Sequence, residues 1–223
     1  MPKNLKGSAS TFMRSKKELC QSWKLYVITQ PMPGLADRVR QAILGGADVI
    51  QLRDKNAADE DLIRQSKSLL EVTRHFHVPL IINDRVAVAQ MVGADGVHLG
   101  QDDGALSAAR TILGEEAIFG RSTHKPEQAL AAEKEGFDYI GVGPVFETPT
   151  KAGRPAVGLE YVRFAAQNVR IPFIAIGGID AANLEKVTHA GAGAVAVVRA
   201  VIASADPQEA ATVLKKNISG KKK

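Results

Sequence analysis

The feature that most constrains the fold of this chain is a regular alternation of short apolar runs with longer amphipathic stretches. Each run has the length and composition of a buried strand, and the alternation is typical of repeated βα units around a parallel sheet. Eight runs follow one another from Lys24 onward: Leu25–Thr29, Val49–Leu52, Leu80–Ile82, Gly96–Leu99, Ile118–Gly120, Tyr139–Val142, Phe173–Ile176 and Ala194–Val198. Eight strands, each followed by a helix, predict an α/β protein with a single-domain (β/α)8 TIM barrel.

The stretches between the runs have the pattern of helices. Asp59–His75 places apolar side chains at helical spacing among charges, and Glu127–Glu135 and Ala181–Ala190 do the same. Gly-Ala-Asp, or a close variant, stands just before a strand at residues 46–48, 93–95, 136–138 and 191–193. We interpret this repeat as structural, a helix end followed by a strand start. A doubly wound open sheet is the main alternative, but residues 30–34 lack the Gly-rich fingerprint that would follow its first strand.

The positive charge of the chain is concentrated at its two ends. The net charge is +5, yet residues 1–24 hold six basic groups against one acid, and residues 215–223 hold five lysines and no acid. Residues 25–214 therefore carry a net charge of −5. We expect a flexible basic extension over 1–23, a catalytic barrel over 24–214 and a Lys-rich tail over 215–223. Nucleic acid is not an expected partner, and weak, salt-dependent contact of the tails with RNA or an anionic surface is the alternative.

Targeting signals are absent from the sequence. No apolar stretch is long enough to cross a bilayer, and the first residues lack the apolar core and cleavage site of a signal peptide. We therefore expect a cytoplasmic protein without a membrane partner. The single cysteine, Cys20, excludes an internal disulfide and a cysteine-based metal cluster, and we interpret it as incidental. A homo-oligomer is compatible with the sequence, which gives no signal for the number of copies.

Polar residues gather directly after the predicted strands, where the loops of a barrel build the active face. Acids and bases occur together there, which favours a divalent cation that holds an anionic, phosphorylated ligand. Asp84 and Asp103 are the candidate metal ligands, and Asp102 is a bystander. Acids after strands also cap helices, so this alternative stays open for Asp84. The set comprises Gln51, Arg53, Lys55, Asn83, Asp84, His98, Gln101, Asp103, Ser122, Thr123, His124, the loop Gly143–Lys151 and Gly177–Gly178.

Two places in this mouth suit phosphate groups. Gly177–Gly178 and the turn Val197–Arg199 follow the last two strands, where many barrels bind phosphate with backbone N–H groups. A glycine pair that only permits a tight turn is the alternative. The loop Thr148–Lys151 adds two hydroxyls and an ammonium beside that corner. Arg53 and Lys55 would reach a second anion from the other side, so two phosphorylated small-molecule ligands are expected.

The histidines give weaker signals. His98 lies at the end of an apolar strand, where a hydrogen-bonded core histidine is more common than a metal ligand. Ser122 and His124 form a Ser-x-His pair, but the sequence places no acid to orient it. Covalent catalysis is therefore a minor alternative.

Five segments together resemble the thiamine-phosphate synthase family: Gln51–Lys55, Asn83–Asp84, Gly96–Asp103, Gly120–His124 and Gly143–Lys151. The resemblance runs in order and with fitting spacing from about Lys24 to about Leu214, and the two tails lie outside it. It implies a Mg²⁺-assisted transferase. Such an enzyme joins a hydroxymethylpyrimidine diphosphate to a hydroxyethylthiazole phosphate and releases pyrophosphate.

The resemblance also implies roles for individual residues. Asp84 and Asp103 would hold Mg²⁺. The catalytic groups would be Lys151, Ser122, Arg53 and Lys55. The pyrimidine diphosphate would contact Gln51, Leu52, Arg53, Asp54, Lys55, Asn83, Ser122 and Lys151. The thiazole phosphate would contact Thr148, Pro149, Thr150, Gly178, Val198 and Arg199.

Arg199 departs from the family pattern, which usually has serine at this position. A guanidinium here is expected either to add a phosphate contact or to crowd the thiazole site, and both alternatives stay open in the sequence. Two other functions are compatible with such a barrel. A thiazole tautomerase of the same superfamily would share the phosphate corner but would not need Asp84 with Asp103 or the loop Thr148–Lys151. A non-catalytic, phosphate-binding regulatory barrel would bind ligands without turnover.

Overall fold

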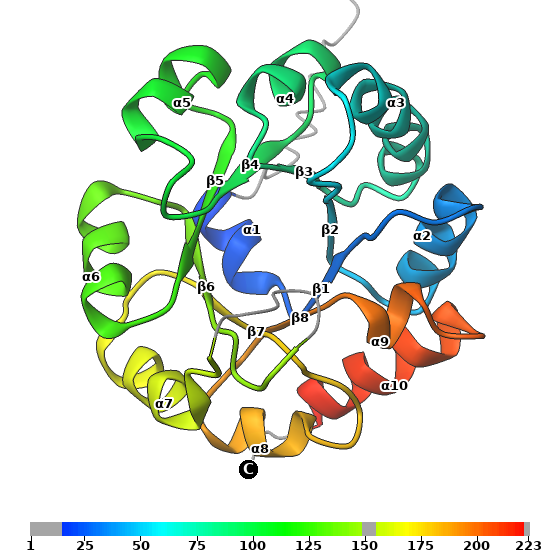
Figure 1. Ribbon diagram of the computed structural model, residues 1–223. Helices are drawn as coiled ribbons and strands as arrows, with labels where there is room; N and C mark the ends of the chain where they lie inside the picture. Colours follow the sequence, from blue (N-terminus) through cyan, green and yellow to red (C-terminus); the bar gives the residue numbers. More distant parts are fainter. Residues whose placement is uncertain (1–14, 149–154, 221–223) are drawn as a thin grey trace, which may run out of the picture.

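The protein is a closed barrel of eight parallel strands, which confirms the predicted fold. The computed structural model describes residues 15–148 and 155–220. Each strand pairs with its neighbours in chain order, and the last strand closes the ring on the first. Figure 1 looks along the barrel axis and shows the helices around the ring of strands. The strands are β1 (Leu25–Ile28), β2 (Val49–Leu52), β3 (Leu80–Asn83), β4 (Gly96–Leu99), β5 (Ile118–Thr123), β6 (Tyr139–Val142), β7 (Phe173–Ile176) and β8 (Val195–Val197).

In the described residues, seven helices lie between consecutive strands in sequence, one additional helix precedes β1, and two helices follow β8. One predicted helix, Asp59–His75, has the same bounds in the structure. The helix predicted over Ala181–Ala190 is shorter, because Asp180 Oδ1 accepts hydrogen bonds from two backbone N–H groups and holds its first residues in a turn. The helices are α1 (Lys16–Ser22), α2 (Leu35–Leu44), α3 (Asp59–His75), α4 (Val86–Val92), α5 (Leu106–Leu113), α6 (Pro126–Glu135), α7 (Gly158–Asn168), α8 (Leu184–His189), α9 (Arg199–Ile202) and α10 (Pro207–Ser219).

Two apolar layers stabilise the barrel. The larger layer lies between the sheet and the helices and contains Val27 and Leu52. The smaller layer fills the inside of the barrel and contains Tyr26, Ile28 and Tyr139. Because successive side chains of a strand point to opposite faces, the alternation decides which residues face the interior. The same rule turns every second residue at the strand ends toward the mouth.

The repeated Gly-Ala-Asp segment joins the N-terminal ends of neighbouring strands. Its aspartates accept hydrogen bonds from a backbone N–H at the start of the preceding strand: Asp48 from Leu25 at 2.9 Å, Asp95 from Leu80 at 2.8 Å and Asp138 from Phe119 at 2.8 Å. Each carboxylate satisfies a backbone donor at a strand end. The structural interpretation of this repeat is therefore confirmed.

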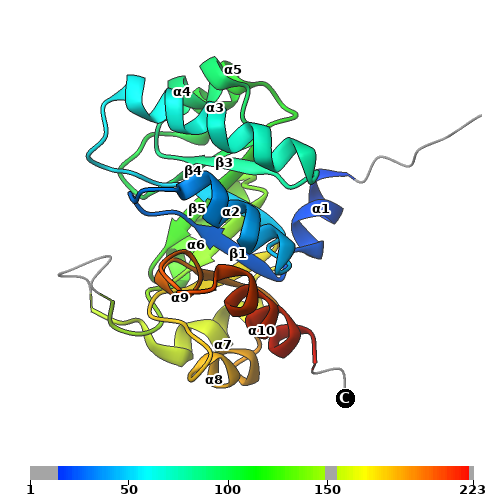
Figure 2. The same cartoon turned by 90° about the vertical axis from the view of Figure 1, so that its right-hand side faces the viewer.

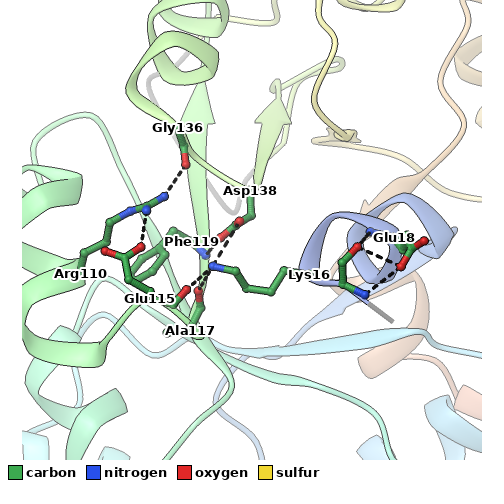
Figure 3. A network of polar contacts seen from close by, with 9 residues as sticks. Lys16, Glu18, Arg110, Glu115, Ala117, Phe119, Gly136 and Asp138 are labelled. Atoms are coloured by element: carbon green, nitrogen blue, oxygen red, sulfur yellow. Dashed lines mark hydrogen bonds and ion pairs between the residues drawn. The ribbon is translucent and has the colours of Figure 1, made fainter. Parts of the chain in front are cut away.

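Helix α1 packs against the N-terminal ends of the strands (Figures 1 and 2). Lys16 donates hydrogen bonds to the carbonyl oxygens of Glu115 and Ala117, and its Nζ lies 3.6 Å from Asp138 Oδ1 (Figure 3). Cys20 and Trp23 are buried. Residues 16–23 thus differ from the flexible extension expected over 1–23, because their apolar side chains cover the end of the barrel. Cys20 accordingly belongs to the packed interior.

The last helix, α10, also differs from the expected boundary. It continues to Ser219, past residue 214, where the Lys-rich tail was expected to begin. Lys215 forms an ion pair with Asp48, and Ile218 is buried against the barrel. Residues 215–219 are therefore part of a packed helix. No helix within residues 15–148 and 155–220 has both the length and the apolar character needed to cross a membrane.

Candidate active site

Three cavities lie in the upper part of the barrel, toward the carboxyl ends of the strands, and neighbouring cavities share lining residues. We refer to the three together as the groove. The glycine-corner cavity, of about 280 Å³, is lined by Thr148, Gly177, Gly178, Val198 and Arg199, among others. The central cavity, of about 50 Å³, is lined by Gln51, Arg53, Asn83, His98 and Ser122, among others. The carboxylate cavity, of about 320 Å³, is lined by Asp54, Lys55, Asn83, Asp84, Arg85 and Asp103.

The shared residues give the order of the cavities across the mouth. Ile176, Ala196 and Val198 line both the glycine-corner cavity and the central cavity. Asn83 lines both the central cavity and the carboxylate cavity. The central cavity therefore lies between the other two.

Strand β2 and the residues after it supply polar groups to the groove. Gln51 is buried and lines the central cavity with Arg53, whereas Lys55 lines the carboxylate cavity. Asp54 lines the carboxylate cavity too, and its Oδ1 accepts hydrogen bonds from two backbone N–H groups of the following loop. Leu52 faces the other side of the sheet, where its side chain is buried in the layer beneath the helices. Only its backbone is therefore available to a ligand.

Asp84 and Asp103 line one cavity from adjacent loops. Lys55 Nζ lies 3.2 Å from Asp84 Oδ2, and Asp103 Oδ2 accepts a hydrogen bond from Gly100 N at 2.7 Å. Asp84 has a φ of 63°, in the left-handed region that Asp tolerates better than most residues. The N-cap of α4 is Arg85, and the helix has no side-chain cap. The capping alternative for Asp84 is therefore not what the structure shows.

The two carboxylates affect each other's ionisation. Burial raises the pKa of Asp84, and the hydrogen bond and the negative charge of Asp103 raise it further, against an opposing effect of Lys55. Burial also disfavours ionised Asp103, but hydrogen bonds to Asp84 and Gly100 and the positive charge of Lys55 outweigh it and hold its pKa below the usual value. The pair therefore resists a second negative charge, a resistance that a bound divalent cation would remove.

The acid pair fits a cation that is shared with a ligand. Mg²⁺ is usually held by one or two carboxylates, while water and substrate phosphates complete its coordination. Within the described residues there is no group of three or more His, Cys, Asp or Glu side chains that could hold a metal ion. Asp84 and Asp103 could supply the one or two carboxylate ligands that Mg²⁺ needs. Their cavity is open, so water and substrate phosphates could complete the coordination.

Gly177 and Gly178 serve the packing of two loops. Their φ values are 105° and 64°, a region that favours glycine. A Cβ on Gly177 would lie 2.5 Å from Pro144 Cα, and one on Gly178 would lie 2.8 Å from Glu147 O. The positive φ values agree with the tight-turn alternative, and the close contacts give a second structural reason for both glycines. The same close approach shapes the glycine-corner cavity, which both residues line.

The structure describes only some of the other residues that were predicted to bind phosphate at this corner. Thr148, Val198 and Arg199 line the glycine-corner cavity, and the side chain of Arg199 is exposed. Pro149, Thr150 and Lys151 lie outside the described residues, so the contacts expected of them stay predictions.

A chain of hydrogen bonds runs through the barrel interior at the central cavity. Gln51 Nε2 donates to Tyr26 Oη at 2.8 Å, and Tyr26 Oη lies 2.8 Å from Tyr139 Oη. Tyr139 Oη lies 3.0 Å from His98 Nδ1. His98 Nε2 lies 2.9 Å from Ser122 Oγ. His98 is thus a hydrogen-bonded interior histidine, as predicted.

These hydrogen bonds change the interpretation of the Ser-x-His pair. Ser122 pairs with His98, whereas His124 Nδ1 lies 2.5 Å from the carbonyl oxygen of Gly143. The sequence interpretation missed Tyr26 and Tyr139, which line the central cavity. The sequence contained a signal for both residues. Each is a tyrosine at an interior-facing position of an apolar strand, where a buried hydroxyl requires a polar partner.

Comparisons with known proteins agree with this geometry. A family model described as thiamine monophosphate synthase matches residues 25–201. A thiamine-phosphate synthase of Thermus thermophilus is 46% identical over 203 residues, which cover 88% of this chain and 98% of that protein. One of Synechocystis sp. is 46% identical over 199 residues, or 89% of this chain, which spans only 58% of that longer relative.

A solved structure shows the same relationship. Thiamine phosphate pyrophosphorylase from Pyrococcus furiosus superposes with a TM-score of 0.83 at 38% identity, and the match covers 91% of this chain and 98% of that one. The family match extends from the start of β1 into α9 and so includes all eight strands and the residues that line the groove. The chain belongs to the thiamine monophosphate synthase family.

Proposed function

We propose that this chain joins 4-amino-2-methyl-5-hydroxymethylpyrimidine diphosphate to 4-methyl-5-hydroxyethylthiazole phosphate, giving thiamine phosphate and pyrophosphate. The observation that carries the proposal is the row of three neighbouring cavities, with cationic side chains beside an acid pair at one end and a glycine corner at the other. A reaction between two phosphorylated molecules requires two anion sites that hold the reacting atoms between them. The central cavity occupies that position.

The pyrimidine diphosphate is assigned to the central and carboxylate cavities. Arg53 and Lys55 bring positive charge to this end of the groove, and Asn83 lines both cavities where the ring and its diphosphate would meet. Asp84 and Asp103 would hold Mg²⁺. When bound, Mg²⁺ supplies positive charge that stabilises the departing diphosphate.

The thiazole phosphate is assigned to the glycine-corner cavity. Gly178, which has only backbone atoms, lines it together with Val198 and Thr148. Arg199 stands at its rim with an exposed guanidinium. Because a guanidinium can bind phosphate oxygens with two N–H groups, Arg199 is compatible with this ligand despite its departure from the family pattern.

The reaction requires little acid–base chemistry from the protein. The C–O bond between the pyrimidine methylene and the diphosphate breaks, and its electron pair goes to the diphosphate. The electron-rich aminopyrimidine stabilises the cationic methylene, and the thiazole nitrogen then donates its lone pair to form the new C–N bond. The protein binds the leaving diphosphate with cations such as Arg53 and Lys55 and aligns the two rings. By resemblance, Lys151 would add a further cation.

An assay with both purified substrates tests this proposal. The protein is mixed with the two substrates and Mg²⁺, and thiamine phosphate and pyrophosphate are followed together, with reactions that omit either substrate as controls. We expect equal amounts of both products, and loss of both on addition of EDTA. Ligand binding without product would contradict the proposal and favour a regulatory barrel. Isomerisation of the thiazole alone would favour a tautomerase. If EDTA did not reduce product formation, the reaction would not depend on a metal ion, and the proposed role of Mg²⁺ would be wrong.

A further inference from the structure

We propose that the interior chain Gln51–Tyr26–Tyr139–His98–Ser122 is a polar relay that fixes which hydrogen-bonding atoms the central cavity presents to a ring. Its two ends, Gln51 on β2 and Ser122 on β5, line the same cavity. Tyr26, Tyr139 and His98 are its positioning residues. The relay deepens the proposed function and rests on it for the identity of the ring.

Proton counting gives the relay a direction. Tyr26 Oη accepts a hydrogen bond from Gln51 Nε2, and among the described residues Tyr139 Oη is the acceptor recorded within reach of the Tyr26 proton. We infer that Tyr26 donates its single proton to Tyr139. The single proton of Tyr139 is then directed to His98 Nδ1. Burial raises the pKa of both tyrosines well above the usual value, so each hydroxyl keeps the proton that the relay requires.

The protonation of His98 determines the direction of its hydrogen bond to Ser122. A neutral imidazole whose Nδ1 accepts a hydrogen bond carries its proton on Nε2. His98 Nε2 therefore donates to Ser122 Oγ at 2.9 Å. The hydroxyl proton of Ser122 is consequently directed toward the cavity. At the other end, Gln51 uses its amide nitrogen inside the relay. Gln51 also lines the central cavity, so its carbonyl oxygen is the group left to face a ligand there.

The resulting pattern is one acceptor and one donor, from Gln51 and Ser122. A 4-aminopyrimidine carries the complementary groups, an amino donor and a ring-nitrogen acceptor. A 4-oxopyrimidine has a carbonyl acceptor and a ring N–H donor, and would require every hydrogen bond of the relay to reverse. The relay thus selects the amino form of the ring against its deaminated form, because a buried mismatch leaves polar groups unpaired.

The packing around the relay keeps its members in contact. A Cβ on Gly120 would lie 2.1 Å from Tyr139 Cζ and 2.6 Å from His98 Nδ1, so glycine leaves the room in which hydroxyl and imidazole meet. The Trp23 ring stacks on Tyr26 with centroids 5.9 Å apart and contacts Tyr139 edge-on at 5.3 Å. Both tyrosine rings are therefore held from the N-terminal end of the barrel.

The first test reads the tautomer of His98 by nitrogen NMR of the full chain, without substrate. In the wild type we expect the proton on Nε2. Gln51→Glu at pH 8 replaces the amide donor with an acceptor and should move the proton of His98 to Nδ1, although Gln51 is separated from His98 by two tyrosines. In the Tyr139→Phe background, Gln51→Glu should no longer move it.

A matched control is Tyr161→Phe. Tyr161 is also buried and its hydroxyl donates to Thr123 Oγ1 at 2.7 Å, outside the relay. We expect the tautomer of His98 to be unchanged in this variant. Two results would overturn the relay. One is a wild-type His98 that carries its proton on Nδ1, and the other is a folded Gln51→Glu variant in which the tautomer of His98 is unchanged. Because this measurement needs no turnover, it stands or falls separately from the synthase activity.

The second test measures selectivity. The dissociation constants of the 4-amino and 4-oxo pyrimidine diphosphates are compared by calorimetry. We expect the wild type to prefer the amino form by about a hundredfold, and Tyr139→Phe to reduce this preference to about tenfold, as for the loss of about one hydrogen bond. In steady-state kinetics the variant should raise KM for the amino substrate more than it lowers kcat. An unchanged preference in Tyr139→Phe would contradict the proposal even if the enzyme were slower.

Discussion

Lys55 Nζ lies 3.2 Å from Asp84 Oδ2, an ion pair that connects the loop after β2 to the end of β3. The side chain of Lys55 is 55% exposed, so such a pair contributes at most about 1 kcal/mol to stability. It balances the charge of Asp84 only in part. The acid pair therefore keeps its capacity for a cation, while Lys55 is free to turn from Asp84 to an incoming diphosphate.

Asp103→Asn should lower turnover about a hundredfold, the effect typical of losing one preorganised electrostatic group. The substitution retains the shape of the side chain but removes its charge. The measurement is kcat at saturating Mg²⁺. Asp102→Asn is the matched control, because Asp102 is exposed and does not line the carboxylate cavity. Equal rates for the wild type and Asp103→Asn would exclude Asp103 from the metal site.

Asp84→Asn should raise the melting temperature of the metal-free protein at pH 7. The pKa of Asp84 is raised in the folded state, so the folded state favours the protonated carboxyl. The stabilising contribution of this carboxyl is present below the unfolded-state pKa and is lost as pH rises through the folded-state pKa. At pH 7 the ionised carboxylate therefore lowers the stability of the folded protein, and the neutral Asn side chain removes this effect. The advantage of the variant should therefore shrink below about pH 4, where Asp84 is protonated in both states. Thermal melts of the metal-free protein between pH 3 and pH 7 measure this. A variant less stable than wild type at pH 7 would contradict it.

Gly193→Asp should stabilise the protein by about 1 kcal/mol, the typical net contribution of one hydrogen bond. Gly193 occupies the place of the aspartate in the fourth Gly-Ala-Asp segment. Because Ala175 pairs with Val195, Gly193 lies opposite Phe173, whose N–H the new carboxylate would bind. A Cβ there has Lys24 Nζ as its nearest neighbour, at 3.9 Å. Urea denaturation measures the change, and Gly193→Ala is the control. Equal stabilisation by both substitutions would exclude the hydrogen bond as its cause.

Cys20 should react slowly with thiol reagents in the native protein. Burial raises the pKa of its thiol to about 12, so little thiolate is present at pH 8. The chain has one cysteine, so labelling reports on α1 alone. We expect Trp23→Ala to accelerate labelling, because it loosens the packing beneath the barrel. Equal rates in native wild type and in urea would contradict the burial of α1.

The barrel and much of its mouth were predictable because both follow from local patterns. Apolar runs fix the strands, and in a parallel barrel every strand ends at the same face, so polar residues such as Asp84 and Ser122 must meet there. Strand alternation could also have placed Leu52 on the outer face. The resemblance named this residue as a contact without distinguishing its side chain from its backbone.

The relay and α1 were not predictable for a different reason. The hydroxyl of Tyr139 meets His98 only because Gly120 on the intervening strand lacks a side chain, a relationship among three strands that no short pattern encodes. Likewise, α1 has few apolar residues, and the surface that buries Cys20 and Trp23 exists only once the barrel has closed. Both features depend on contacts between segments far apart in the sequence.

The position of α1 has a consequence for water. Among the described residues, α1 lies across one end of the barrel (Figure 1), and Cys20 and Trp23 are buried in the interior cluster. We infer that solvent reaches the hydroxyl groups of the interior from the opposite end, through the central cavity. The hydroxyl protons of Tyr26 and Tyr139 must therefore exchange with bulk water past the central cavity. A bound ring would close that entrance, and the interior would then keep its protons and their orientation for the lifetime of the complex.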